Sequence, residues 1–152
     1  MEYRGKSEDL AIVTMLATSG VVCVWLVDLT VAGFEEGLLP LVMLGAAVGA
    51  AGAGYFVAPL FGRPGAMGVA LAAIAALIAT GLGGILGGVL VYFLNPMLHP
   101  RTTPWADEAP GLMSFALTSG ELVTASLRVP LVGFSWLAMM VGIHLISLNL
   151  KR

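Results

Sequence analysis

Long apolar runs alternate with short polar turns along the chain. Apolar residues dominate four stretches, at residues 10–31, 38–60, 66–94 and 131–150. A helix needs about 20 apolar residues to cross the roughly 30 Å hydrocarbon core of a bilayer, and each stretch reaches that length. The pattern therefore predicts an all-α integral membrane protein with about four transmembrane helices, forming a single transmembrane domain over residues 1–152.

The short polar segments between the apolar runs predict tight connections between the helices. Residues 33–37 and 62–65 are rich in glycine and charge and are typical of short turns. The third run is longer than a bilayer requires, because at 1.5 Å per residue it would extend about 43 Å. We expect this helix to tilt, to protrude or to break at its glycines.

Residues 96–127 form the sizeable polar stretch. Four prolines predict an irregular first half, whereas the second half mixes apolar residues with serine and threonine. Thr118 and Glu121 have the spacing of a capping box, which predicts that a helix begins near Thr118. Bulky apolar residues indicate a short interfacial segment on the membrane surface between the third and fourth spans. These residues are Trp105, Met113, Phe115 and Leu117.

The basic residues predict the orientation. Four spans place both termini on one side of the membrane, and basic residues favour the cytoplasmic side. The side of the termini would hold Arg4, Lys6, Arg63, Lys151 and Arg152. The other side would hold only Arg101 and Arg128. We therefore predict cytoplasmic N- and C-termini.

The composition indicates that lipid surrounds most of the chain, and it argues against one class of function. Hydrophobic residues make up 59% of the chain and charged residues 11%, with a mean hydropathy of +0.97. An ordinary soluble domain carries roughly 25% charged residues. The net charge of −2 and the lack of a basic stripe argue against nucleic-acid binding. The expected surroundings are the lipid bilayer and other membrane helices.

Small residues repeat every four positions along the second and third predicted spans. Such GxxxG-like ladders let two helices approach closely, which favours association in lipid. The ladders are Gly45, Gly49 and Ala53 in one span and Ala76, Thr80, Gly84 and Gly88 in the other, with Gly83 and Gly87 on a neighbouring face. Two interpretations are open. The ladders dock other membrane subunits or copies of this chain, or the two spans pack on each other.

Ionisable residues are scarce inside the predicted spans, which argues against a proton or cation carrier. Asp28 lies near the end of the first span, where a carboxylate can reach the hydrated interface. A transporter or channel is still open if several copies form a pore between them. Its polar lining would come from the first span, at Thr14, Thr18, Ser19 and Thr30.

His144 is the histidine inside a predicted span. A neutral imidazole there can ligate haem iron or the magnesium of chlorophyll. The stretch from Arg128 to Ile146 resembles the single span of bacterial light-harvesting α polypeptides, whose histidine holds bacteriochlorophyll. The likeness covers only this part of the chain, and the other three spans have no counterpart there. The resemblance implies His144 as a pigment ligand.

No set of residues with the spacing of a catalytic site occurs in the sequence, so we do not expect an enzyme. His99 with Asp107 and Glu108 lacks the two-histidine spacing of a metal site, and no metal is predicted. The preferred hypothesis is a non-catalytic accessory or structural subunit that packs against a larger membrane complex. The alternatives are an oligomeric small transporter or channel, and a haem- or chlorophyll-binding subunit that uses His144.

Overall fold

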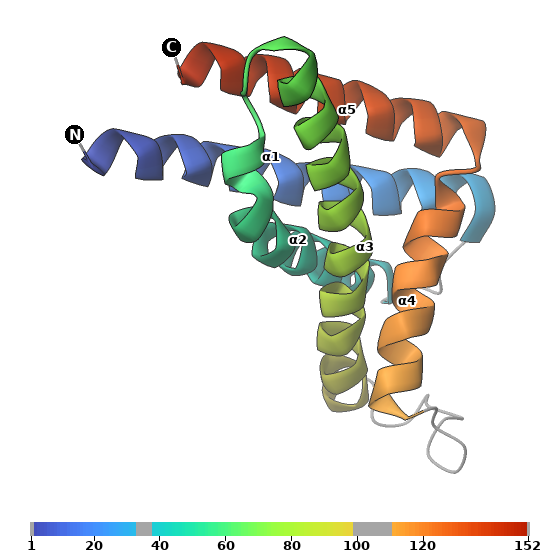
Figure 1. Ribbon diagram of the computed structural model, residues 1–152. Helices are drawn as coiled ribbons and strands as arrows, with labels where there is room; N and C mark the ends of the chain where they lie inside the picture. Colours follow the sequence, from blue (N-terminus) through green and yellow to red (C-terminus); the bar gives the residue numbers. More distant parts are fainter. Residues whose placement is uncertain (1, 33–37, 99–110, 152) are drawn as a thin grey trace.

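The structure is a computed structural model that describes residues 2–32, 38–98 and 111–151, and every regular element in these ranges is a helix (Figure 1). In chain order they are α1 (Glu2–Val27) with a π-helical extension η1 (Asp28–Ala32), α2 (Leu38–Val57) with a 3₁₀ turn η2 (Ala58–Leu60), α3 (Gly65–Leu98), α4 (Leu112–Ser126) and α5 (Pro130–Leu150). The all-helical fold predicted from the sequence is confirmed for these residues.

Four of the helices are long and apolar enough to cross a membrane, as predicted. The candidate spans are Lys6–Thr30, Leu38–Leu60, Gly65–Leu94 and Pro130–Leu150. They agree with the apolar runs of the sequence to within a few residues. Helix α1 begins well before its apolar run and carries its charged first turns as a continuous extension of the span.

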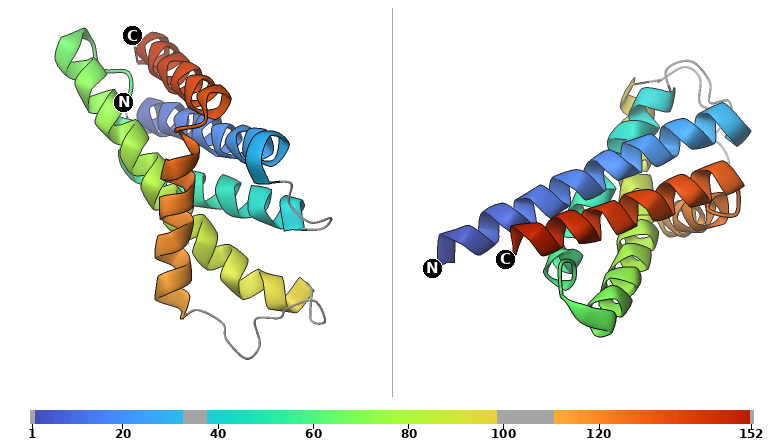
Figure 2. Two further views of the ribbon diagram at one scale, coloured as in Figure 1. Left: turned by 90° about the vertical axis from the view of Figure 1, so that its right-hand side faces the viewer. Right: turned by 90° about the horizontal axis from the view of Figure 1, so that it is seen from above.

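The helices are not arranged as a simple parallel bundle. Helices α1 and α5 run antiparallel and side by side, with the first turn of α1 and the last turn of α5 at the same end (Figures 1 and 2). Helix α3 crosses this pair steeply and runs antiparallel to α4, while α2 contacts both α1 and α3. The shared end agrees with an even number of spans; that it faces the cytoplasm stays a prediction.

Helix α3 is a single unbroken helix of 34 residues, Gly65–Leu98. It therefore does not break at its glycines, and it continues four residues past the predicted end at Leu94. Its apolar part, Gly65–Leu94, has 30 residues. At 1.5 Å per residue this part extends about 45 Å, so a steep tilt is needed to fit it within a hydrocarbon core of about 30 Å. The steep crossing over α1 and α5 is consistent with such a tilt.

Helix α4 corrects the expected start of the helix in the polar stretch. The helix begins at Leu112, directly after Gly111, and the predicted start near Thr118 is wrong. Thr118 and Glu121 both lie inside the helix, so they form no capping box there. The cause is tertiary packing: Ala116 and Gly120 are buried against α3, and this contact extends the helix toward its N-terminal side. The irregular first half of the stretch, including Trp105, lies outside the described residues.

The main buried cluster lies where α1, the end of α2, the first half of α3 and α5 meet. Small side chains from α3 allow the other elements to close around it. The cluster consists of Ile12, Leu16, Val57, Ala58, Phe61, Ala72, Ala75, Ala76, Ala79, Met140 and Ile143. This core fixes the turn between α2 and α3 against the last turns of α5.

Candidate functional site

Polar side chains from α1 and α5 meet at the turn between α2 and α3. Pro59 lies in the first turn of η2, and the chain then becomes extended at Phe61. Gly62 follows with φ +73°, a left-handed conformation that glycine adopts without penalty. A Cβ at Gly62 would lie 2.7 Å from the backbone carbonyl carbon and oxygen of Ser147. Only glycine lets this turn lie directly on α5.

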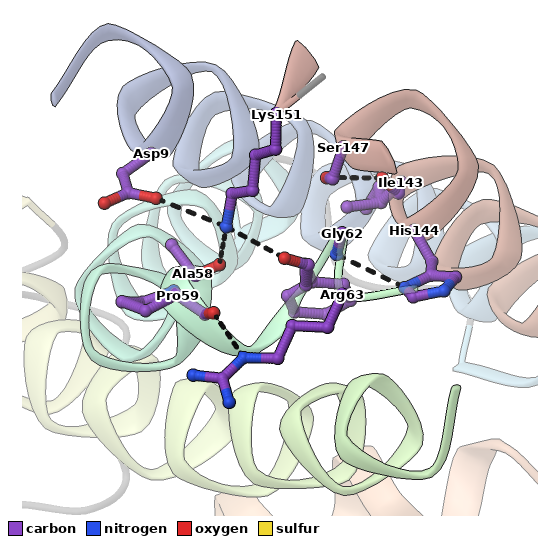
Figure 3. Close-up of polar contacts among 10 residues, drawn as sticks. Asp9, Ala58, Pro59, Gly62, Arg63, Ile143, His144, Ser147 and Lys151 are labelled. Atoms are coloured by element: carbon purple, nitrogen blue, oxygen red, sulfur yellow. Dashed lines mark hydrogen bonds and ion pairs between the residues drawn. The ribbon is translucent and has the colours of Figure 1, made fainter. Parts of the chain in front are cut away.

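His144 holds the turn from α5. The Gly62 N–H donates a hydrogen bond to His144 Nδ1 over 3.3 Å, although 82 residues separate the two positions (Figure 3). The imidazole is buried, with 7% of its surface exposed, and Nε2 has no hydrogen-bond partner among the described residues. His144, which the sequence singled out, therefore has a tertiary role, and its partner Gly62 was not predicted.

Lys151, which directly follows the last residue of α5, links this helix to the turn a second time. Its Nζ donates to the Phe61 carbonyl oxygen over 2.8 Å and to the Ala58 carbonyl oxygen over 3.4 Å. The same Nζ lies 3.8 Å from Asp9 Oδ1 of α1 (Figure 3). One cation thus joins the end of α5, the end of α2 and the start of α1. Both carbonyl groups lie just after α2, where η2 begins and ends; the Ala58 carbonyl also accepts the Phe61 N–H, over 3.2 Å.

The hydrogen bond at His144 decides which nitrogen carries the proton. Because Nδ1 accepts from the Gly62 N–H, the neutral imidazole has its proton on Nε2. A haem iron or chlorophyll magnesium needs a free lone pair on a ring nitrogen. The lone pair of Nδ1 is directed at Gly62, whereas Nε2 is protonated and enclosed. The arrangement does not fit an axial ligand for either cofactor.

The first predicted glycine ladder lies in the contact between α2 and α3. A Cβ at Gly49 would collide with the Gly83 carbonyl oxygen and would lie 2.6 Å from the Gly87 nitrogen. A Cβ at Gly45 would lie 2.9 Å from the Gly87 carbonyl oxygen. Ala53, the last member, is fully buried. These residues let two helix backbones touch, as the within-chain interpretation of the ladder expects.

The second predicted ladder has a different neighbour from the one expected. A Cβ at Gly84 would lie 3.2 Å from the Gly120 Cα, and one at Gly88 would collide with Ser119. Helix α4 therefore covers the face of α3 that carries Gly84 and Gly88. Earlier on α3, Ala76 is buried in the main cluster. A partner outside this chain would meet these faces only after α4 or α2 had moved away.

Thr80 connects α3 to α5 rather than lining a contact with α2. Its Oγ1 donates to the Ala76 carbonyl oxygen over 2.7 Å and accepts from Trp136 Nε1 over 2.9 Å. The indole of Trp136 is thereby fixed against α3. Since a buried indole N–H requires an acceptor, this bond also satisfies the polar end of Trp136.

The hydroxyl groups proposed for a pore bond to their own helix. Thr14 donates to the Leu10 carbonyl oxygen, Thr18 to that of Thr14, and Thr30 to that of Leu26, over 2.6 to 2.9 Å. Ser19 is buried and donates to the Leu16 carbonyl oxygen. Thr14 and Thr18 on α1 and Thr30 on η1 are exposed, but their hydroxyl donors are already used. Asp28 makes an interaction within the chain.

Two contacts were missed in the sequence, and one of them had a signal. Ala116, Gly120 and Thr124 on α4 repeat every four residues, which is the same small-residue spacing that identified the ladders on α3. Lys151 gave no such signal, because a terminal lysine reads as a solvated charge. The predicted absence of a metal site at His99, Asp107 and Glu108 concerns residues outside the described part of the chain.

Comparisons of the chain with protein-family models, with curated proteins and with solved structures find no match.

Proposed function

We propose that this chain is a non-catalytic accessory or structural subunit of a larger membrane assembly. The supporting observation is how the described spans use their polar side chains. His144 and Lys151 hold the α2–α3 turn, Trp136 and Thr80 link α5 to α3, and the hydroxyls of α1 bond to their own backbone. These groups stabilise the architecture, and the outer surface they leave is apolar.

The outer surface of α5 offers a contact for a helix of another subunit. Ala138 and Gly142 lie four residues apart, so they share one helix face. A Cβ at Gly142 would meet no atom within 4 Å in the described part of the chain. Unlike the glycine faces of α2 and α3, this face is uncovered within the chain. A neighbouring transmembrane helix could approach closely here because both side chains are small.

The test is purification of the tagged full chain from its native membranes in a mild detergent. We expect the chain to migrate with other polypeptides at a fixed ratio, as one species larger than a single 15.7 kDa subunit in detergent. Gly142→Leu should lower the recovered partner severalfold without unfolding the chain, since its side chain points into open space. Ala70→Leu, an equally bulky change at an exposed position on α3, should leave the partner yield unchanged.

Two outcomes would count against the proposal. A chain that is extracted from native membranes as a monomer at all detergent levels is not a subunit. A species made only of copies of this chain, with ion or solute flux in reconstituted vesicles, would instead support the oligomeric transporter or channel. If a partner is present but Gly142→Leu does not affect it, the contact lies on another face.

A further inference from the structure

A shallow apolar groove lies at the elbow where α4 meets α5. Its volume is about 270 Å³, and it is lined by Leu127, Pro130, Gly133, Phe134, Trp136 and Leu137. The groove faces outward, since 73% of Phe134 and 51% of Leu137 are exposed. None of the contacts described for the α2–α3 turn involves these residues, so the groove is separate from that site.

The backbone of the elbow packs closely at Gly133, which is one of the residues that line the groove. The Gly133 N–H donates to the Val129 carbonyl oxygen over 2.8 Å, and a Cβ at Gly133 would collide with the Leu127 carbonyl oxygen. The elbow can therefore pack this closely only because residue 133 has no side chain. The inner wall is the indole of Trp136, which its hydrogen bond to Thr80 keeps in place.

The length of α5 relates the groove to the thickness of a bilayer. The helix has 21 residues, which at 1.5 Å per residue extend about 31 Å and match the hydrocarbon core of about 30 Å. With α5 along the membrane normal, Pro130 would lie at one hydrocarbon boundary. The lining residues 130–137 reach about 10 Å into that leaflet, where the upper part of an acyl chain lies.

Arg128 lies two residues before α5 and directly follows Leu127, one of the residues that line the groove. Its side chain is exposed, and no ion pair joins it to the described residues. The other basic side chains that the structure describes lie in other elements: Lys6 in the first turns of α1, Arg63 in the turn between α2 and α3, and Lys151 directly after the opposite end of α5. A guanidinium group binds phosphate with two parallel hydrogen bonds and is well suited to a headgroup.

We infer that the elbow is a binding site for an anionic phospholipid. Arg128 binds the headgroup phosphate, and one acyl chain lies in the groove against Trp136 and Phe134. An anionic lipid is favoured over a zwitterionic one because a basic residue near the membrane surface contributes about 1 kcal/mol of attraction, equivalent to about a fivefold preference. This inference does not depend on the proposed subunit role.

Trp136 provides a direct reporter of the occupant. In a chain with Trp25→Phe and Trp105→Phe, Trp136 is the remaining tryptophan of three. The protein is reconstituted in phosphatidylcholine vesicles in which about one-fifth of the lipid is either brominated phosphatidylglycerol or brominated phosphatidylcholine. Bromine quenches indole fluorescence at contact. We expect the anionic lipid to quench Trp136 as if it were enriched about fivefold at the groove, and high salt to reduce this enrichment.

Variants at the charge separate the site from general lipid contact. Arg128→Gln should bring the two brominated lipids to equal quenching, while Arg128→Lys should keep most of the preference. Arg63→Gln, which removes a charge at the opposite end, should leave it unchanged. Because the salt dependence is measured on the parent chain, the inference can be tested even if Arg128→Gln folds poorly.

Three results would overturn the inference. One is equal quenching by both lipids in the parent chain. A second is an anionic preference that persists in Arg128→Gln. The third is weak quenching by either lipid together with disulfide formation between chains that carry Phe134→Cys in a Cys23→Ala background, which would identify a second copy of this chain as the occupant.

Discussion

Two regions of the molecule hold helices together by different means. Along α2, α3 and α4 the contacts are made by backbones that touch at Gly49, Gly83, Gly87 and Gly120. At the α2–α3 turn, the contacts with α5 and α1 are made by polar side chains, chiefly His144. The first region depends on the absence of side chains, and the second on specific donors and acceptors.

The difference follows from the surroundings. Lipid tails are as apolar as leucine, so two apolar helices gain little by leaving lipid for each other, and close packing must supply the attraction. In the turn between α2 and α3 the regular helical hydrogen bonds end, and a lysine from the end of a neighbouring helix donates to carbonyl groups there. The glycine region is therefore sensitive to added volume, while the polar region is sensitive to lost hydrogen bonds.

The largest effect is expected in the glycine region. Gly49→Val places a Cβ on the Gly83 carbonyl oxygen and close to the Gly87 nitrogen, both of them backbone atoms that cannot rotate away. Overpacking usually costs about 1–3 kcal/mol, and a clash with two backbones should exceed it, at about 4 kcal/mol or more. The measurement is the free energy of unfolding in detergent, or the yield of folded protein after extraction.

Gly142→Val is the matched control for this prediction. It introduces the same side chain into a transmembrane helix, but at a position with no neighbour within 4 Å in the described chain. We expect it to change the free energy of unfolding by less than about 0.5 kcal/mol, as for most surface substitutions. Equal destabilisation by the two variants would show that helix propensity, not contact between backbones, explains the loss.

The sequence predicted the glycine region better than the polar one, though only in part. Apolar length predicted the four spans because hydrocarbon thickness fixes the length of a helix that crosses it. The four-residue spacing identified Gly45 and Gly84 as contact residues. It did not show that Gly84 would meet α4, because small-residue spacing records that a close approach is possible and not which helix approaches.

The polar region could be predicted only as isolated residues. His144 was recognised as unusual because an imidazole inside a span needs a partner. Its partner is a backbone N–H 82 residues away, in a turn whose positive φ at Gly62 no local pattern reveals. The start of α4 was misjudged for a related reason, since packing on α3 outweighed the capping-box spacing at Thr118.

An intermediate effect is expected at Gly62. Gly62→Ala combines a strained left-handed residue, at about 1–2 kcal/mol, with a contact against the Ser147 backbone, so about 3 kcal/mol in total is expected. Gly65→Ala is the control, because Gly65 also has a positive φ, +79°, but no neighbour within 4 Å. It should lose only about 1–2 kcal/mol. Unfolding titrations of both variants would measure the two losses of unfolding free energy, and their difference is the cost of the contact with Ser147. Similar losses would mean that the turn does not contact α5 closely.

The smallest effect distinguishes the two kinds of bond that Lys151 makes. Its hydrogen bonds to the Phe61 and Ala58 carbonyl oxygens are charge-assisted, and only 24% of the lysine side chain is exposed. Lys151→Met, which keeps the apolar stem, should therefore cost about 1–2 kcal/mol of unfolding free energy. Asp9 is 39% exposed and 3.8 Å from Nζ, so solvent screens the ion pair, and Asp9→Asn should cost less than about 0.5 kcal/mol. High salt should reduce the loss in Asp9→Asn but leave most of the loss in Lys151→Met. If instead the two variants were equally destabilised and equally sensitive to salt, the ion pair rather than carbonyl capping would hold α5 to the turn.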